Sequence, residues 1–284
     1  MTVSYYVPGV LWRKDPIASS VPLVFDAPHS GTQNPPDFQF TCDPLVIRRG
    51  ADLFVDELYE DAPRHGATLI SALFPRAYID ANRNETDIYH PDHDGADQKT
   101  ENRNLKPWNA LVRSQNWQGG AEFYGRKLRL AEIHSRIESH YRPYHDTLRN
   151  TLDAQHARFG GVWHVNCHSC RSMNRRVSPP RPNADFIIGN RFGHTCAQEF
   201  TDIIADTLSG LGYAVSLNRP YQGATLIRRY AAPDRERHSV QIEINKKLYL
   251  DDAEKSENFS ALKRDIGTLI AGISDYVRGK VMHL

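Results

Sequence analysis

The chain has 284 residues, of which 40% are hydrophobic, and this is enough for one large domain with a substantial core. Its 35 basic and 34 acidic residues give a formal net charge of +1, so we expect no basic surface for nucleic acid or for an anionic membrane. The N-terminus lacks a basic stretch followed by an apolar run, and no stretch approaches the roughly 18 apolar residues of a membrane span. Four cysteines are too few for a disulfide scaffold. We therefore expect a soluble, cytoplasmic, single-domain protein comprising residues 1–284.

Strand and helix patterns alternate along most of the chain. Residues 1–20 contain two prolines and little periodicity, so we expect a surface lead-in. β-branched and apolar runs predict strands at 21–27, 67–73, 77–80, 161–170, 184–189, 213–217 and 239–245. Amphipathic patterns predict helices at 51–65, 121–158, 192–211 and 259–277. Pro143 should kink or break the second helix. This alternation predicts an α/β protein with a central sheet and helices on both faces.

Residues 84–120 show no convincing period, and a loop of this length inside a compact domain is more often functional than idle. We expect it to fold over the functional site. Within the loop, His90-Pro91-Asp92-His93-Asp94-Gly95 has the composition of a second metal site or a calcium loop. It lacks the closing acidic ligand of an EF-hand, so a solvated, substrate-covering loop is the preferred interpretation.

Polar side chains follow three of the predicted strands. His29 follows the strand at 21–27, His168 lies near the end of the strand at 161–170, and Asp80 is followed by Asn82-Arg83. Ligands of open α/β sheets bind beyond the carboxyl ends of the strands. A lone His at a strand end is more often a hydrogen-bonded structural residue. Two histidines with one carboxylate, however, leave a fourth zinc position open for water, as in hydrolytic zinc sites.

Several short segments of the chain, taken in sequence order, resemble the pattern of the N-formylglutamate amidohydrolase family. That family is similar to the zinc carboxypeptidases and to the succinylglutamate desuccinylase and aspartoacylase group. The segments are His29-Ser30-Gly31, Asp52 with Leu58-Tyr59, Asp80-Ala81-Asn82-Arg83, Pro143-Tyr144-His145, Cys167-His168-Ser169, Ile188-Gly189 and Gln241-Ile242-Glu243. The resemblance implies a three-layer α/β/α fold with a mixed, mostly parallel sheet, as in zinc exopeptidases and phosphorylase/hydrolase-like folds. It also implies hydrolysis of N-formyl-L-glutamate, in histidine degradation, to formate and L-glutamate, with a small-molecule substrate and one zinc ion.

The resemblance implies that His29 is the first zinc ligand and His168 the last. In the related enzymes the second ligand is a Glu three residues after the first His, and here that position is Thr32. Another carboxylate must therefore complete the set. Asp52 is the predicted ligand, because its spacing to Leu58-Tyr59 resembles the acidic position of the family. The two alternatives are Asp56 and Glu57.

Substrate and base residues also follow from the resemblance. Asn82 and Arg83 resemble the pair that grips the substrate carboxylate, and a guanidinium offers a planar fork for that purpose. The alternative is that Arg83 pairs with Asp80. Glu243 resembles the general base that activates water. Because an acid in an apolar strand is costly to bury without a partner, a structural ion pair is the alternative role of Glu243.

Further residues are expected near the reacting groups. Arg228 is the predicted stabiliser of the tetrahedral oxyanion, with Arg229 as the alternative. His145 is expected to touch substrate or to orient a carboxylate, unless it only packs within its helix. A dicarboxylic substrate needs a second cation besides Arg83. The candidates that the sequence leaves open are Arg142, Arg171, Arg175, Arg176, Arg181 and Arg191.

Three other functions fit parts of the sequence. Cys167 and Cys170 have the spacing of a thiol-disulfide exchange motif, which would make this a redox protein. A catalytically silent binding protein with the same fold is a second alternative, but it would not need Glu243. The third is a deacylase of another N-acyl amino acid, because excluding a larger acyl group is worth only a few kcal/mol. The sequence does not indicate an oligomeric state.

Overall fold

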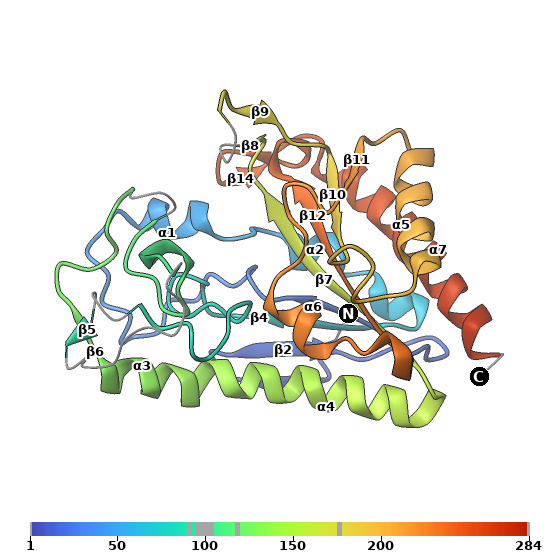
Figure 1. The fold of residues 1–284 in the computed structure, drawn as a ribbon, viewed down its shortest axis with the longest axis horizontal. Helices are drawn as coiled ribbons and strands as arrows, with labels where there is room; N and C mark the ends of the chain where they lie inside the picture. Colours follow the sequence, from blue (N-terminus) through green and yellow to red (C-terminus); the bar gives the residue numbers. More distant parts are fainter. Residues whose placement is uncertain (1, 90–92, 95–104, 117–119, 175–177, 283–284) are drawn as a thin grey trace.

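The computed structural model describes residues 2–89, 93–94, 105–116, 120–174 and 178–282, and it is built around one eight-stranded sheet (Figure 1). The strand order across this sheet is β1-β2-β4-β3-β7-β12-β10-β11. The bounds of these strands are β1 Tyr5–Val7, β2 Leu11–Lys14, β3 Leu23–Ala27, β4 Thr68–Ala72, β7 Val162–Cys170, β10 Phe186–Gly189, β11 Val215–Leu217 and β12 Arg237–Asn245.

Parallel pairing dominates the centre of the sheet. β4, β3, β7 and β12 run parallel to one another, and β11 runs parallel to β10. Antiparallel pairs occur where β2 joins β1 and β4, and where β10 joins β12. The sheet is therefore mixed and mostly parallel. The carboxyl ends of β3, β7 and β12 meet at one edge, where ligands of such sheets bind.

Helices cover both faces, which confirms the predicted three-layer α/β/α fold (Figure 1). α4 and α6 pack on one face, and α2, α5 and α7 pack on the other. The helix bounds are α1 Pro44–Gly50, α2 Val55–Leu58, α3 Leu130–Arg136, α4 Arg142–Phe159, α5 Gln198–Gly210, α6 Thr225–Tyr230 and α7 Phe259–Val281. Short pairs lie outside the main sheet: β5 His93–Asp94 with β6 Leu128–Arg129, β8 Met173–Asn174 with β9 Arg181–Pro182, and β13 Leu250–Asp251 with β14 Glu254–Lys255. In the described part of the chain, no helix combines the length and apolarity needed to cross a membrane.

The two faces of the central strands differ in chemistry. Successive side chains of a strand point to opposite faces, so one face of β7 carries Trp163, Val165 and Cys167, which join the apolar core under α2, α5 and α7. The opposite face carries the polar residues His164, Asn166 and His168, all of them buried. β12 repeats the pattern, with Val240, Ile242 and Ile244 in the core and Ser239, Gln241 and Glu243 on the polar face. The functional residues of these strands therefore share the polar face.

The N-terminal segment does not match its prediction. Residues 1–20 were expected to form a surface lead-in, but β1 and β2 form one edge of the main sheet. Leu11 of β2 pairs with Ala72 of β4 and is fully buried. The strands are short and separated by a turn at Gly9, where φ is +70°, so neither shows a long apolar run.

The predicted helix at 51–65 and the predicted strand at 77–80 are both wrong. The first segment contains only α2 and a 3₁₀ turn, Ala62–His65, because Phe54 adopts a left-handed conformation with φ of 59°. The backbone N–H of Asp52, just before α2, instead donates to the carbonyl of His29. The segment at 77–80 forms turns, and the N–H of Asp80 bonds the carbonyl of Leu111 rather than a neighbouring strand.

Two other helices begin later than predicted. The helix expected at 121–158 begins with α3 at Leu130, continues through a π-turn at Ile137–Tyr141 and becomes α4. Pro143 is the second residue of α4, directly after this π-turn, so the regular α-helix is interrupted next to the proline. The helix expected at 192–211 starts only at Gln198, since Arg191 and Phe192 are left-handed with φ of 52° and 59°.

Candidate functional site

A cavity of about 650 Å³ lies at the carboxyl ends of β3, β7 and β12. His29, Asp52 and His168 line it, together with Glu243. The described parts of 84–120 also contribute to its wall, through Asn84, Asp87, Asn109, Arg113 and Asn116. His90-Pro91-Asp92 and Gly95 lie outside the described residues, so the prediction of a substrate-covering or metal-binding loop there is untested.

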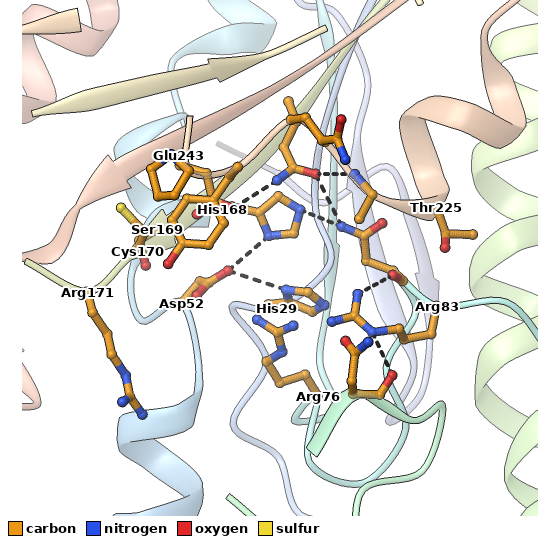
Figure 2. Close-up of a pocket in the computed structure, with 18 of the residues that line it drawn as sticks. His29, Asp52, Arg76, Arg83, His168, Ser169, Cys170, Arg171, Thr225 and Glu243 are labelled. Carbon is orange, nitrogen blue, oxygen red and sulfur yellow. Dashed lines mark hydrogen bonds and ion pairs between the residues drawn. The ribbon is translucent and has the colours of Figure 1, made fainter. Parts of the chain in front are cut away.

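His29, Asp52 and His168 converge on the floor of this cavity (Figure 2). One ligand atom from each residue lies within 4.8 Å of the others, and all three side chains are buried. The Asp52 carboxylate lies between the imidazoles, with Oδ2 3.3 Å from Nδ1 of His29 and 3.0 Å from Nδ1 of His168. Burial by itself would raise the pKa of Asp52, but the adjacent His168 and His29 side chains hold it well below its usual value.

Backbone contacts explain why Asp52, and not a neighbouring acid, reaches the histidines. The N–H of Asp52 donates to the carbonyl of His29, and Ser30 Oγ donates to the carbonyl of Asp52. The two alternatives point elsewhere. Asp56 accepts a hydrogen bond from Ser71 Oγ, and Glu57 pairs with Lys255 at 2.5 Å.

The donor set fits one divalent cation. Nε2 of His29 lies 2.6 Å from Oδ1 of Asp80, whose carboxyl pKa is well below its usual value because the charges of Arg76 and Arg113 outweigh burial. The ionised Asp80 can only accept, so Nε2 of His29 carries a proton, and in the neutral form of the ring Nδ1 is unprotonated. Nδ1 is buried, faces the Asp52 carboxylate and has no hydrogen-bond partner in the described protein. A cation would satisfy both groups, and two His with one carboxylate are a zinc ligand set.

A group of guanidinium side chains surrounds Asp80. Arg76 Nη2 lies 2.9 Å from Oδ2 of Asp80, and Arg113 donates to the same oxygen. Burial and the nearby Arg76 lower the pKa of Arg113 to about 9. Sequence reasoning missed both arginines: Arg76 lies four residues before Asp80, whereas nothing in the sequence indicates Arg113. Because Arg83 lines the same wall, three cations face one carboxylate, so this side of the cavity favours an anion.

Glu243 lies beside His168 in the register of β12 and β7, on the polar face. Its Oε1 accepts a hydrogen bond of 2.8 Å from Nε2 of Gln241, whose own Oε1 accepts from the N–H of Ala224 at 3.1 Å. The orientation of the Gln241 amide is therefore fixed. Burial raises the pKa of Glu243.

Asn82 and Arg83 both line the cavity. The Asn82 amide is already bonded within the protein: Oδ1 accepts from the N–H of Leu226, and Nδ2 lies 3.4 Å from Oδ1 of Asn166. Asn82 therefore connects strands and loops around the floor. The guanidinium of Arg83 is half-buried and donates to the carbonyls of Asn109 and Asn82.

Of the other predicted site residues, only some line the cavity. Arg228 lines the cavity, is exposed and donates to Oδ1 of Asn84 at 3.2 Å. Arg229 and His145 do not line the cavity, so the predicted substrate contact of His145 does not fit the structure. His145 is buried behind the site in α4, and its Nε2 donates to the carbonyl of Ala81 at 2.9 Å. It supports the backbone next to Asn82.

The structure separates the other candidate arginines. Arg171 and Arg191 line the cavity, and Figure 2 shows Arg171 and Arg83 on opposite sides of the histidine pair. Arg142 instead pairs with Glu85 at 2.6 Å, outside the cavity. Arg181 is exposed on β9 and does not line it. Arg175 and Arg176 lie outside the described residues.

Cys167 and Cys170 do not have the environment of an exchange motif. All four cysteines are free, and these two lie within the extended strand β7, three residues apart and hence on opposite faces. Burial raises the pKa of both thiols, whereas a reactive cysteine needs a lowered pKa. The structure therefore contradicts the redox interpretation.

The chain is similar to known proteins over most of its length. Residues 21–250 match the N-formylglutamate amidohydrolase family. The chain is 28% identical to an N-formylglutamate deformylase of Pseudomonas putida over 243 residues, covering 82% of this chain and 84% of the relative. It is 27% identical to an N-formylglutamate deformylase of Pseudomonas aeruginosa over 240 residues, covering 82% and 83%.

The chain is also similar to solved structures. A crystal structure of an N-formylglutamate amidohydrolase from Ralstonia eutropha JMP134 superposes with a TM-score of 0.90 at 38% identity, covering 96% of this chain and 99% of that one. A protein of Agrobacterium tumefaciens, the gene product Atu2144, has the same fold with a TM-score of 0.65 at 19% identity, covering 94% and 96%.

The fold and the site thus define an α/β enzyme with a buried His-Asp-His cluster suited to one cation. The chain belongs to the N-formylglutamate amidohydrolase family. It is an amidohydrolase that acts on linear amides, as the resemblance of its sequence implied.

Proposed function

We propose that this enzyme hydrolyses the amide bond of N-formyl-L-glutamate to formate and L-glutamate, with one zinc ion held by His29, Asp52 and His168. The observation that carries the proposal is the convergence of these three buried side chains on the floor of a cavity whose wall is rich in guanidinium groups. The names of the relatives and of the family support the substrate. A cytoplasmic role in histidine degradation stays a prediction of the sequence.

The metal site and the residues around it have separate roles in the proposed reaction. A zinc ion, when bound, would activate a water molecule and polarise the formyl carbonyl. His29 and His168 are suited to hold it, since each has a second ring nitrogen fixed by a neighbour: Nε2 of His29 by Asp80 and Nε2 of His168 by Asn166. Such hydrogen bonds fix the ring orientation and raise the basicity of a ligand.

Glu243 is the proposed general base. Its raised pKa suits a group that takes a proton from the attacking water and then gives it to the amine nitrogen of the departing amino acid. Gln241 donates to Oε1 of Glu243 and so holds the carboxylate in one orientation. Water adds to the formyl carbon, the C–N bond breaks, and formate and the amino acid are released.

The two substrate carboxylates match the charge of the wall. Arg83 is the proposed partner of the α-carboxylate, because it lines the cavity and a guanidinium can bind a carboxylate through two parallel hydrogen bonds. Arg76 and Arg113 lie near it, and both pair with Asp80. This excess of positive charge supports a dicarboxylic substrate over a neutral one.

Two arginines are candidates for stabilising the tetrahedral oxyanion. Arg228 is one of them, since it lines the cavity. Arg76 is the better-placed candidate, because it is largely buried and its charge interacts with both Asp52 and Glu243. A donor held in a buried site stabilises developing charge more strongly than an exposed donor does.

A substrate panel tests the proposal. Metal-free protein is reloaded with Zn²⁺, and kcat/KM is compared for N-formyl, N-acetyl and N-succinyl derivatives of glutamate, with N-formyl-leucine as a neutral side-chain control. We expect N-formylglutamate to be hydrolysed fastest and activity to follow one bound Zn²⁺ per chain. Full activity of metal-free protein would contradict the zinc site. A higher kcat/KM for a longer acyl group would instead assign a different N-acyl amino acid.

The Arg83→Lys variant tests the carboxylate contact. Lysine keeps the charge but loses the bidentate fork, so we expect kcat/KM to fall at least about tenfold for every acidic substrate. Arg142→Lys is the matched control, because Arg142 is exposed and lies outside the cavity. Equal kcat/KM values for the two variants would remove Arg83 from the substrate site.

A further inference from the structure

A buried polar network lies under the site, on the α4 side of the sheet. It contains Asp26 of β3, His164 and Asn166 of β7 and Ser239 of β12, with exposed fractions of 0%, 1%, 0% and 0%. The strand registers place Asp26 opposite Asn166 and Ser239 opposite His164. None of these residues lines the cavity. Because buried polar groups cost free energy unless each is bonded, such a network calls for a specific role.

The Asp26 carboxylate is the centre of this network. Oδ1 accepts from Nε2 of His164 at 2.8 Å and from Nδ2 of Asn166 at 2.8 Å, and Oδ2 accepts from the hydroxyl of Tyr144 at 2.7 Å. Burial would raise the pKa of Asp26, but His164 and the other donors hold it below its usual value. An ionised carboxylate has no proton to donate, so each neighbour must turn a donor toward it.

This requirement fixes the Asn166 amide. Its Nδ2 points to Asp26, so its Oδ1 points to His168, where it lies 2.6 Å from Nε2. An amide oxygen only accepts, and Nε2 of His168 therefore carries the proton. In the neutral form of the ring, Nδ1 of His168 is then unprotonated, 3.0 Å from Oδ2 of Asp52.

Without that constraint His168 would have a second stable tautomer. Nδ2 of Asn82, an amide donor, lies 3.0 Å from Nε2 of His168. An unprotonated Nε2 could accept from Asn82, and the proton would then reside on Nδ1 and donate to Asp52. That tautomer cannot use Nδ1 to bind a cation. The orientation of Asn166 therefore selects between a binding and a non-binding form of His168.

We propose that Asp26 is a positioning residue that acts through Asn166: its carboxylate fixes the amide, and the amide fixes the tautomer in which Nδ1 of His168 is free to bind a divalent cation. The inference rests on the metal site of the proposed function. It extends that site to a residue of another strand, which touches neither the cavity nor the three candidate ligands.

The Asp26→Asn variant tests the relay with two readouts that do not need turnover. Histidine side-chain ¹⁵N–¹H spectra of the metal-free protein report which nitrogen of His168 carries the proton, and competition with a chelator gives the Kd for Zn²⁺. We expect the Nδ1–H tautomer to appear and the Kd to rise roughly 10–100-fold, the range for lost hydrogen-bond partners of metal ligands. Tyr144→Phe is the matched control: it also removes a buried partner of Asp26, but it leaves the contact between Asp26 and Asn166 in place. Its Kd should stay within about threefold of the wild-type value.

Asn166→Ala and the double variant complete the test. If Asp26 acts through Asn166, Asn166→Ala alone should weaken Zn²⁺ binding at least as much, and adding Asp26→Asn should cause no further loss. Asn166→Ala also provides the answer if Asp26→Asn does not fold, as judged by thermal unfolding of the metal-free protein. Wild-type affinity in Asn166→Ala, an additive double variant, or an Asp26→Asn Kd equal to that of Tyr144→Phe would overturn the proposal. If the wild-type chain itself does not bind Zn²⁺, the metal site fails, while the His168 spectra still show whether Asp26 controls the tautomer.

Discussion

The two faces of β7 carry different kinds of interaction on the same backbone. Trp163, Val165 and Cys167 fill the apolar core beneath α2, α5 and α7, where shape and area determine the packing. His164 and His168, on the α4 side, are held by hydrogen bonds to specific atoms. Apolar packing tolerates other residues of similar volume, whereas a polar network requires each donor and acceptor. Strand alternation therefore separates the residues that stabilise the fold from those that perform the chemistry.

The largest expected effect lies on the polar face. Glu243→Gln keeps the shape of the side chain but removes the proposed base, so kcat should fall about 100–10,000-fold. The substitution removes a buried charge, so the thermal unfolding temperature should be unchanged or higher. Steady-state kinetics, Zn²⁺ content and calorimetry measure these quantities. Wild-type turnover with full Zn²⁺ content would reject Glu243 as the base.

A neighbouring residue on the opposite face should behave in the reverse manner. Ile242→Ala opens a cavity in the fully buried core and should lower the free energy of unfolding by about 2–5 kcal/mol. It leaves the polar face intact, so kcat per folded molecule should stay within about twofold of the wild-type value. Urea unfolding and kinetics well below the unfolding transition test both statements. A loss of kcat as large as that of Glu243→Gln would show that the two faces are not separable.

The pH dependence of stability should also distinguish the faces. Asp26 has a pKa below its usual value, so its contribution to folding is fully present above the unfolded-state pKa of about 3.9 and is lost as the pH falls through the folded-state pKa. Asp26→Asn should therefore destabilise by about 1–3 kcal/mol at pH 7 and by less in acid. Ile242→Ala should cost the same at both pH values. Urea unfolding at pH 7 and near pH 3.5 tests this difference; equal pH profiles for the two variants would contradict it.

The smallest expected effect concerns Cys167, on the apolar face beside His168. Cys167→Ala should lower stability by about 1 kcal/mol through lost packing and should leave kcat/KM within about twofold of the wild-type value. A redox enzyme would lose its function with this thiol. Turnover under reducing and oxidising conditions is the measurement, and a dependence of hydrolysis on the thiol would restore the rejected redox interpretation.

Much of the site could be predicted because its residues stand next to strong local patterns. His29 and His168 follow or end strands that are recognisable from their apolar content, and Glu243 lies in another such strand. The sheet brings those strand ends to one edge. Predictions that relied on helix periodicity did less well: α2 is only Val55–Leu58, because a left-handed Phe54 and the bond between Asp52 and His29 override the local pattern.

The sequence by itself determined where the central strands lie along the chain, the alternation that gives β7 and β12 one apolar and one polar face, and the family to which the chain belongs. These properties depend on residues that are close in the sequence, so the local pattern of apolar and polar residues indicates them. Only the tertiary structure decided that Asp52 and not Asp56 faces the histidines, that Arg76 and Arg113 share Asp80, and that Asp26 supports Asn166. Each of these contacts joins segments that are distant in the chain, and the register of the sheet and the path of the loops set their distances.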